Sequence, residues 1–185
     1  HSAGLFGRYQ DSAVEETVLS LQSFLESRGL RVFLGDTTAS EIAGIRVEDS
    51  GQSLPETIDV GIVVGGDGTM LHVARTLADF GVPLIGINLG RLGFLTEIPA
   101  ENMEQKLDEI LNGDFIIEER TMLSARVTQE DNVLADCTAL NDIFLSKGDT
   151  GRMIEFETKV SNQSVARTRS DGIIVATPTG STAYA

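Results

Sequence analysis

The sequence contains few of the residues on which several classes of protein depend. Among its 185 residues there are one cysteine, no tryptophan and two histidines. A single thiol cannot form an internal disulfide, so a reducing compartment fits best, and we predict a cytoplasmic protein with Cys137 as a small buried residue. His1 and His72 belong to no Cys/His cluster, so the sequence carries no zinc pattern and supports no Ser-His-Asp triad.

Basic residues are also scarce. The chain has 14 Lys and Arg against 28 Asp and Glu, which gives a net charge of −14. Nucleic acid and anionic lipid repel such a chain, so we expect neither as a partner. No apolar run approaches the ~20 residues of a membrane span, and no signal peptide is visible. The negative charge still allows a phosphate-rich small molecule as ligand, if local hydrogen-bond donors and a metal ion supply the attraction.

The first half of the chain has the pattern of an α/β domain. Residues 58–64 are almost wholly apolar, as expected of a strand buried on both faces. Gly65-Gly66-Asp67-Gly68 follows at once, then apolar residues at helical spacing up to Gly81, and a second buried strand at 82–87. This is a βαβ unit, which predicts a parallel, Rossmann-like sheet with helices on both faces.

Upstream of that unit, further elements are predicted. Leu5-Phe6 is a candidate first strand, and residues 30–34 form another. Between them a helix begins with a Ser-x-x-Glu capping box at Ser12 and Glu15 and stops at Gly29. Residues 35–57 are mixed and polar, typical of a connecting region.

After Pro99 the pattern changes. One more amphipathic helix, 101–111, is followed by segments with a period of two. We predict a hairpin of 121–129 with 133–147, a second of 154–161 with 164–169, and a short strand at 173–176. The prediction is an α/β domain at 1–99 and a β-rich domain at 100–185. The chain begins without Met and stops at Tyr184-Ala185, directly after a turn, so we expect the natural protein to continue and the β-rich domain to be incomplete.

Gly65-Gly66-Asp67-Gly68-Thr69 is the first candidate site. It lies where a buried strand ends and a helix begins, the place where open α/β sheets bind ligands. Glycines let phosphate oxygens approach backbone N–H groups, and an aspartate there suits proton transfer or metal binding. The alternative is that Asp67 only caps the helix while the glycines turn the chain. The pattern is neither that of a dehydrogenase nor that of a P-loop.

Three further segments are candidates. Residues 88–95 form a second turn with glycines, in which Phe94 either stacks on a base or packs in the core. Asn141 and Asp142 interrupt an apolar strand, and such side chains need either a ligand or a neighbouring backbone. Residues 169–172 and the hydroxyl-rich 177–184 suit a ligand edge or an exposed loop.

Together these segments resemble the NAD kinase family. The matching stretches are Gly-Gly-Asp-Gly-Thr at 65–69, Asn-x-Gly-x-Leu-Gly-Phe-Leu at 88–95, Leu-Asn-Asp at 140–142, Met-Ile-Glu-Phe-Glu at 153–157, and Arg-Ser-Asp-Gly through Ser-Thr-Ala-Tyr at 169–184. The resemblance implies transfer of a phosphoryl group from ATP or polyphosphate to the 2′-hydroxyl of the adenosine ribose of NAD. It also implies Mg²⁺ and a homodimer or homotetramer. No metal ligand is identified.

The resemblance also implies residue roles. Asp67 is the expected proton acceptor, and Gly65, Gly66, Gly68 and Thr69 form the phosphate-facing turn. The expected NAD contacts are Asp67, Gly68, Phe94, Asn141, Asp142, Arg152, Arg169, Asp171, Thr179, Thr182, Ala183 and Tyr184. In this family the position of Asp171 often serves a neighbouring subunit. Two alternatives stay open: a lipid or sugar kinase with the same glycine turn, and a non-catalytic nucleotide-binding fragment.

Overall fold

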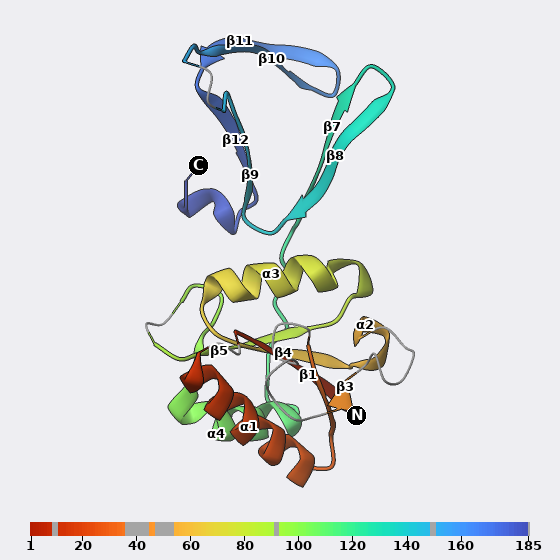
Figure 1. Cartoon of the computed structure of the whole chain (residues 1–185), viewed down its shortest axis with the longest axis vertical. Coiled ribbons are helices and arrows are strands. Elements are labelled where there is room, and N and C mark those ends of the chain that lie inside the picture. Colours follow the sequence, from red (N-terminus) through yellow and green to blue (C-terminus); the bar gives the residue numbers. More distant parts are fainter. Residues whose placement is uncertain (9–10, 36–44, 47–53, 91–92, 149–150, 185) are drawn as a thin grey trace. The chain divides into compact units, whose positions relative to one another are not determined.

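The structure, a computed structural model, describes residues 1–184 except 9–10, 36–44, 47–53, 91–92 and 149–150. Most of the predicted connecting region at 35–57, and residues 91–92 of the second glycine turn, therefore lie outside the described residues. The chain forms two compact units, His1–Glu118 and Glu119–Ala185 (Figure 1).

The first unit contains a six-stranded sheet in the order β3-β2-β1-β4-β5-β6. Every pair of neighbouring strands is parallel, as predicted. The strands are β1 (Ser2–Gly7), β2 (Arg31–Leu34), β3 (Ile45–Arg46), β4 (Val60–Val64), β5 (Leu84–Asn88) and β6 (Ile98–Pro99). Parallel order brings the carboxyl ends of β1, β4 and β5 to one edge of the sheet, which is where the glycine turn begins.

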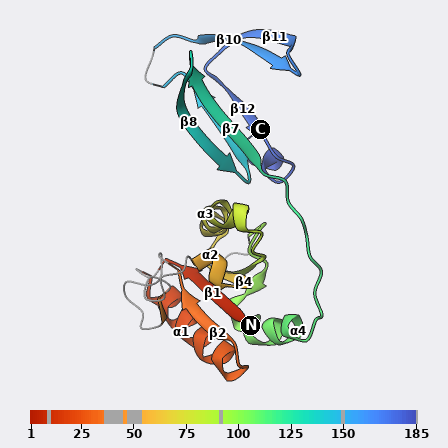
Figure 2. The same cartoon turned by 90° about the vertical axis from the view of Figure 1, so that its right-hand side faces the viewer.

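Helices cover both faces of this sheet, which confirms the predicted α/β class (Figure 2). On one face α1 (Ser12–Ser27) and α4 (Met103–Leu111) pack with alternate strand residues such as Leu5 and Ile62. On the other face α3 (Asp67–Leu77) packs with Phe6 and Val63. The short helix α2 (Leu54–Thr57) and the 3₁₀ turns η2 (Ala78–Phe80) and η3 (Ala100–Asn102) complete the unit. Successive strand residues point to opposite faces, so one apolar strand supplies two cores.

The start of α1 differs from the predicted capping box. Asp11, in an extended conformation, is the N-cap, and its carboxylate accepts a 3.0 Å hydrogen bond from the N–H of Ala13. Ser12 is already the first helical residue. The prediction failed because Asp11 also satisfies the preference for a capping side chain and stands one residue earlier. The stop at Gly29 is confirmed, since its φ of 81° is one that glycine adopts without strain.

The first unit extends past the predicted domain boundary at residue 99. Met103 and Leu107 of α4 are buried in the same core as α1, and the compact unit ends at Glu118. The change of pattern after Pro99 marks the last strand of the sheet. The helix that follows still belongs to this unit, because its apolar face packs on the sheet.

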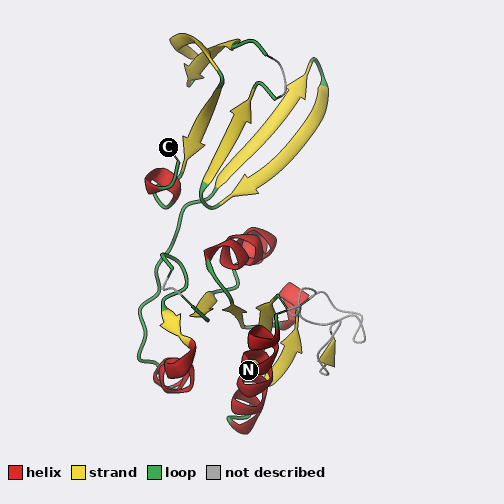
Figure 3. Ribbon diagram, turned by 60° about the vertical axis from the view of Figure 1, so that its left-hand side comes forward, coloured by secondary structure: helices red, strands yellow, loops and turns green. Residues whose placement is uncertain are grey.

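The second unit consists of antiparallel strand pairs (Figure 3). The predicted hairpins are present as β7 (Leu123–Gln129) with β8 (Asn132–Ala139) and β10 (Ile154–Val160) with β11 (Gln163–Ser170). The prediction of one strand over 133–147 is wrong. The chain breaks after β8, and β9 (Asp142–Ser146) pairs with β12 (Gly172–Ala176), before the 3₁₀ turn η4 (Gly180–Thr182). At the break, the Asn141 carbonyl accepts a hydrogen bond from the Thr177 N–H, which extends the β9–β12 pairing by one residue.

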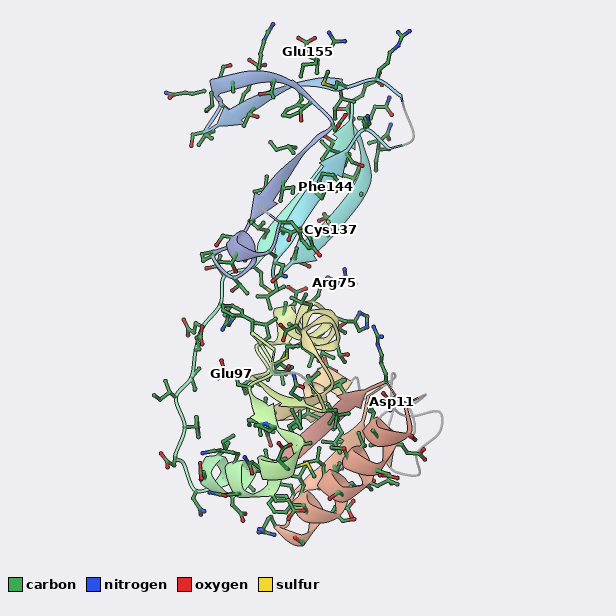
Figure 4. All side chains as sticks on the ribbon, turned by 90° about the vertical axis from the view of Figure 1, so that its left-hand side faces the viewer. Asp11, Arg75, Glu97, Cys137, Phe144 and Glu155 are labelled. Atoms are coloured by element: carbon green, nitrogen blue, oxygen red, sulfur yellow. The ribbon has the colours of Figure 1, made fainter. Side chains whose placement is uncertain are left out.

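Cys137 corrects a second expectation. It lies on β8 and is exposed (Figure 4). Its strand pairs only with β7, and no described element covers most of the strand's side chains. Among the described helices of the chain, none has the length and apolar character needed to cross a membrane.

Candidate functional site

The glycine turn joins β4 to α3. The N–H of Gly65 donates to the carbonyl of Ile87 at 2.9 Å, which ties the turn to β5. Gly65 has a φ of 150°, and a Cβ there would stand 2.9 Å from the Thr69 hydroxyl oxygen, so only glycine fits. At Gly66 and Gly68 an added Cβ would meet nothing within 4 Å. These two glycines therefore present open backbone at the N-terminus of α3.

A cavity of about 370 Å³ lies against this turn. Its lining comes from the carboxyl ends of three neighbouring strands and from the starts of two helices. The lining residues are Arg8, Asp11, Val14, Val64, Gly65, Gly66, Gly68, Thr69, Asn88, Leu89 and Gly90. The predicted turn residues Gly65, Gly66, Gly68 and Thr69 thus all border one cavity. Helix N-termini carry partial positive charge, which favours an anionic ligand here.

Sequence reasoning missed Arg8 and Asp11 in this cavity. Arg8 directly follows β1, and Asp11 lies at the start of α1 (Figure 4). Arg8 is a basic residue of the cavity lining, whereas the carboxylate of Asp11 accepts the Ala13 N–H. A signal was present in the sequence: Arg8 follows the first predicted strand, as the glycine turn follows a later one, so both belong at the carboxyl edge of a parallel sheet.

Asp67 opens α3 and binds the second glycine turn. Its Oδ2 accepts one hydrogen bond, from the N–H of Phe94 at 2.9 Å. Its Oδ1 accepts from the N–H of Leu95 at 3.0 Å and from the N–H and hydroxyl of Thr96 at 3.2 and 3.3 Å. Partial burial opposes ionisation of this carboxyl, but the three amide donors and the hydroxyl outweigh it and hold the Asp67 pKa below its ordinary value.

This geometry contradicts the alternative that Asp67 only caps its own helix. The residue does not cap its own helix, because the N-cap of α3 is Gly66 and no side chain caps this end. Instead its carboxylate joins the two glycine turns. Gly93 makes this approach possible, since a Cβ at that position would collide with Asp67 Oδ1 and stand 2.8 Å from the Thr96 hydroxyl oxygen.

Phe94 follows Gly93 in this second turn. Its ring is 60% exposed, which contradicts the alternative that it packs in the core. The backbone N–H of Phe94 donates to the Asp67 carboxylate, while the side chain is largely exposed. Stacking on a base stays a prediction.

In the second unit, Asn141 lies where β8 gives way to β9, beside the hydroxyl-rich segment. The buried hydroxyl of Thr177 lies 2.5 Å from the carbonyl of Leu140 and accepts the N–H of Gly180. A Cβ on Gly180 would collide with the carbonyl of Asn141, so the two segments are in close contact. Within the described part of the chain, the side chains of Asn141 and Asp142 make no hydrogen bond, although their backbones are engaged. Among the described residues, neither side chain therefore has the neighbouring-backbone partner that was one of the two alternatives, and a ligand contact stays a prediction.

The other predicted residues of this unit occupy several places. Thr179 accepts a hydrogen bond from Arg120 at 3.1 Å, and Thr182, Ala183 and Tyr184 follow it at the end of the described chain. Asp171, 72% exposed, forms a 2.7 Å ion pair with Lys147. Arg169 lies on β11 opposite Glu155, and Arg152 precedes β10. The structure thus brings Asn141, Asp142 and Thr179 together, while Arg152 and Arg169 belong to the β10–β11 hairpin.

The fold and the cavity define an α/β protein with a glycine-lined cavity at the carboxyl edge of a parallel sheet. Family comparison specifies it further. The ATP-NAD kinase N-terminal domain matches residues 4–115, and the ATP-NAD kinase C-terminal domain matches residues 140–185. The chain belongs to the NAD kinase family.

Individual relatives agree. The chain is 49% identical to an NAD kinase of Aromatoleum aromaticum over 98% of its own length and 61% of the relative's, and 48% identical to one of Laribacter hongkongensis over 98% and 62%. The chain therefore spans about three fifths of the curated relatives it matches.

Solved structures share the fold. A yeast NADH kinase in complex with NADH matches with a TM-score of 0.84 at 24% identity, covering 100% of this chain and 59% of that one. An Archaeoglobus fulgidus NAD kinase in complex with ATP matches with a TM-score of 0.69 at 28% identity, covering 100% and 64%.

Proposed function

We propose that the protein is an NAD kinase that transfers the γ-phosphoryl group of ATP to the 2′-hydroxyl of the adenosine ribose of NAD, forming NADP. The observation that carries this proposal is the Asp67 carboxylate, held by the second glycine turn beside the open backbone of Gly66 and Gly68. The names of the relatives, and the ATP in the Archaeoglobus fulgidus structure, support the choice of substrates.

In this scheme Asp67 Oδ2 receives the proton of the ribose hydroxyl. A carboxylate offers about four lone-pair positions, roughly two on each oxygen. Oδ1 already has three partners, whereas Oδ2 has one among the described residues. As the proton moves to Oδ2, the ribose oxygen bonds to the γ-phosphorus and the bond from that phosphorus to the leaving oxygen of ADP breaks. Because the lowered pKa makes Asp67 a weak base, the proton moves late in this step.

The glycine-lined cavity is the proposed position of the donor phosphates. Open backbone at Gly66 and Gly68, the N-terminus of α3 and the guanidinium of Arg8 all favour anions there. Mg²⁺ enters this proposal as part of the donor substrate, MgATP. The described residues contain no group of three or more His, Cys, Asp or Glu that would cage a metal ion, which fits an ion held mainly by phosphates and water. Alignment of the two substrates supplies on the order of 7–11 kcal/mol, more than the proton transfer.

The second unit is the main proposed holder of NAD. The side chains of Asn141 and Asp142, which make no hydrogen bond among the described residues, suit a ribose diol or an exocyclic amine. In the first unit, the exposed side chain of Phe94 suits stacking on a base. Further proposed contacts are Gly68, Arg152, Arg169, Asp171, Thr179, Thr182, Ala183 and Tyr184. We propose a cytoplasmic homodimer or homotetramer in which the exposed Asp171 serves a neighbouring subunit. Replacing Asn141 with Ala is expected to raise the KM for NAD more than it lowers kcat, and an unchanged KM would make Asn141 structural.

The activity is tested in what we call the extended protein: this chain followed by the residues that follow the matched region in the Aromatoleum aromaticum NAD kinase. The extended protein is given ATP, Mg²⁺ and NAD, and NADP is measured with an NADP-specific dehydrogenase. The expected result is one NADP per ADP. The Aromatoleum aromaticum enzyme, assayed beside it, is the control.

Three results would contradict the proposal. In the first, the control enzyme makes NADP while the extended protein, folded by circular dichroism, does not. In the second, ADP appears with diacylglycerol or sphingosine and not with NAD, which identifies a lipid kinase. Calorimetric binding of NAD without ADP release would identify a non-catalytic binding protein.

A further inference from the structure

A buried pair of polar side chains lies behind Asp67. Thr96 is 0% exposed and Asn88 is 5% exposed. The Asn88 side-chain amide donates to the Thr96 hydroxyl oxygen at 2.9 Å, and that hydroxyl lies 3.3 Å from Asp67 Oδ1. The pair joins the end of β5 to the carboxylate that opens α3.

The direction of each hydrogen bond follows from the chemistry of the donors. The N–H of Gly90 lies 2.7 Å from Asn88 Oδ1 and can only donate, so the oxygen of the amide is directed at Gly90. The nitrogen of the same amide is therefore directed at Thr96. Since an amide nitrogen only donates, Thr96 accepts with its hydroxyl oxygen. Its single proton is then left for Asp67 Oδ1, the one other acceptor it meets among the described residues.

The segment that carries Thr96 has little room to move. The carbonyl of Thr96 accepts the N–H of Gly93. On the other side, a Cβ at Gly86 of β5 would stand 2.9 Å from the Thr96 Cα, so the segment lies directly on the strand. The hydroxyl donor is therefore held in place by the sheet itself.

We propose that Thr96, oriented by Asn88, is a positioning residue that holds Asp67 Oδ1 and so aims Oδ2 at the reacting hydroxyl. This inference rests on the proposed function. If the carboxylate of Asp67 rotated, Oδ1 would lose its three donors. The carboxylate therefore keeps its orientation, in which Oδ2, the oxygen with one donor among the described residues, faces away from Thr96. Removing the hydroxyl takes away the one side-chain donor to Oδ1 and leaves amide donors alone, so the carboxylate is held less tightly in this orientation.

The test compares three substitutions in the extended protein. Thr96→Val removes the hydroxyl at nearly constant volume and is expected to lower kcat by roughly 10- to 100-fold, with the KM values for NAD and ATP changed less than about threefold. Thr96→Ser keeps the hydroxyl and is expected to restore kcat. The matched control is Thr76→Val, which removes an exposed hydroxyl bonded to the His72 carbonyl on the same helix. It is expected to leave kcat and both KM values unchanged.

A double-mutant cycle separates positioning from general damage. In an Asp67→Asn background, Thr96→Val is expected to lower the residual kcat by less than about twofold, because the group it positions is already lost. An equal loss in both backgrounds would make Thr96 merely structural and overturn the proposal. An unchanged kcat in Thr96→Val alone would also overturn it while the NAD kinase activity stands.

Two further results keep the outcome clear. If the unsubstituted extended protein makes no NADP, the proposed function fails before the role of Thr96 is tested. If circular dichroism shows that Thr96→Val does not fold, Thr96→Cys takes its place, since a thiol fills similar space and donates weakly. Full kcat with cysteine would overturn the positioning role, and a loss would support it.

Discussion

Strands β4 and β12 are both short, apolar and rich in β-branched residues, yet their surroundings differ. In β4, Ile62, Val63 and Val64 are buried between α1 on one face of the sheet and α3 on the other. In β12, Val175 is half exposed, and the strand pairs only with β9. The same kind of sequence is thus core in one unit and surface in the other.

The difference extends to the whole of each unit. Helices cover both faces of the parallel sheet, as such sheets require. In the second unit, each antiparallel strand has a single hydrogen-bonded partner, and isolated two-stranded ribbons are marginal in water. Large apolar residues are exposed on each of its described strands, namely Val127, Val133, Leu134, Phe144, Leu145, Val160, Val165 and Val175. Burial in a second layer, and not strand sequence, therefore distinguishes the two units.

The largest expected effect tests burial directly. Phe33, on β2, is fully buried, whereas Phe144, on β9, is 60% exposed. Phe33→Ala is expected to lower the free energy of unfolding by about 3–5 kcal/mol, and Phe144→Ala by less than about 1 kcal/mol. Urea unfolding followed by circular dichroism at the helical signal measures Phe33→Ala, because the described α-helices all lie in the first unit, and hydrogen exchange of the β9 and β12 amides measures Phe144→Ala. Equal losses would show that the Phe144 ring is covered in solution.

A smaller effect is expected at a tight contact of the second unit, that of Gly180 with Asn141. An alanine at Gly180 would collide with the backbone of Asn141, whereas at Gly151 an added Cβ meets nothing within 4 Å. Gly180→Ala is expected to destabilise this unit by about 1–3 kcal/mol, and Gly151→Ala by only a few tenths. Hydrogen exchange of the β9 and β12 amides reports the difference. If the β9 and β12 amides of Gly180→Ala exchange as slowly as those of the unsubstituted chain, the contact with Asn141 does not stabilise this unit, and the prediction is wrong.

The smallest effect compares one substitution, Asp→Asn, in the two units. At neutral pH, Asp67→Asn is expected to lower the free energy of unfolding by up to about 2 kcal/mol, because Asp67 accepts four hydrogen bonds. Asp171→Asn removes an exposed ion pair and is expected to cost about 0–1 kcal/mol.

The effect at Asp67 depends on pH in a definite direction. Its pKa is lowered in the folded protein, so its contribution is present above the pKa of about 4 of an unfolded aspartate and is lost as the pH falls through the lower folded value. Urea unfolding at pH 7 and at successively lower pH measures the difference in the free energy of unfolding between the unsubstituted chain and Asp67→Asn. This difference is expected to shrink as the pH falls. If it grows instead, the hydrogen bonds are not the cause of the lowered pKa.

Much of the first unit was predictable because its signals are local. The apolar run at 58–64, the glycines that follow and the helical spacing after them predict a βαβ unit from neighbouring residues alone. The N-cap at Asp11 and the exposure of Cys137 were missed. In the first case two adjacent residues had the same preference, and in the second, strand periodicity does not tell whether a second layer covers the strand.

The sequence by itself determined the class of the fold, the βαβ unit, and the glycine turn with Asp67 at the start of a helix. These depend on backbone preferences and periodicities within a few residues. The tertiary structure alone decided that Asp67 binds the amides of 94–96, that Arg8 and Asp11 border the same cavity, and that Asn88 orients Thr96. Such contacts join residues far apart in the chain, and their distances are set only when the strands align in register.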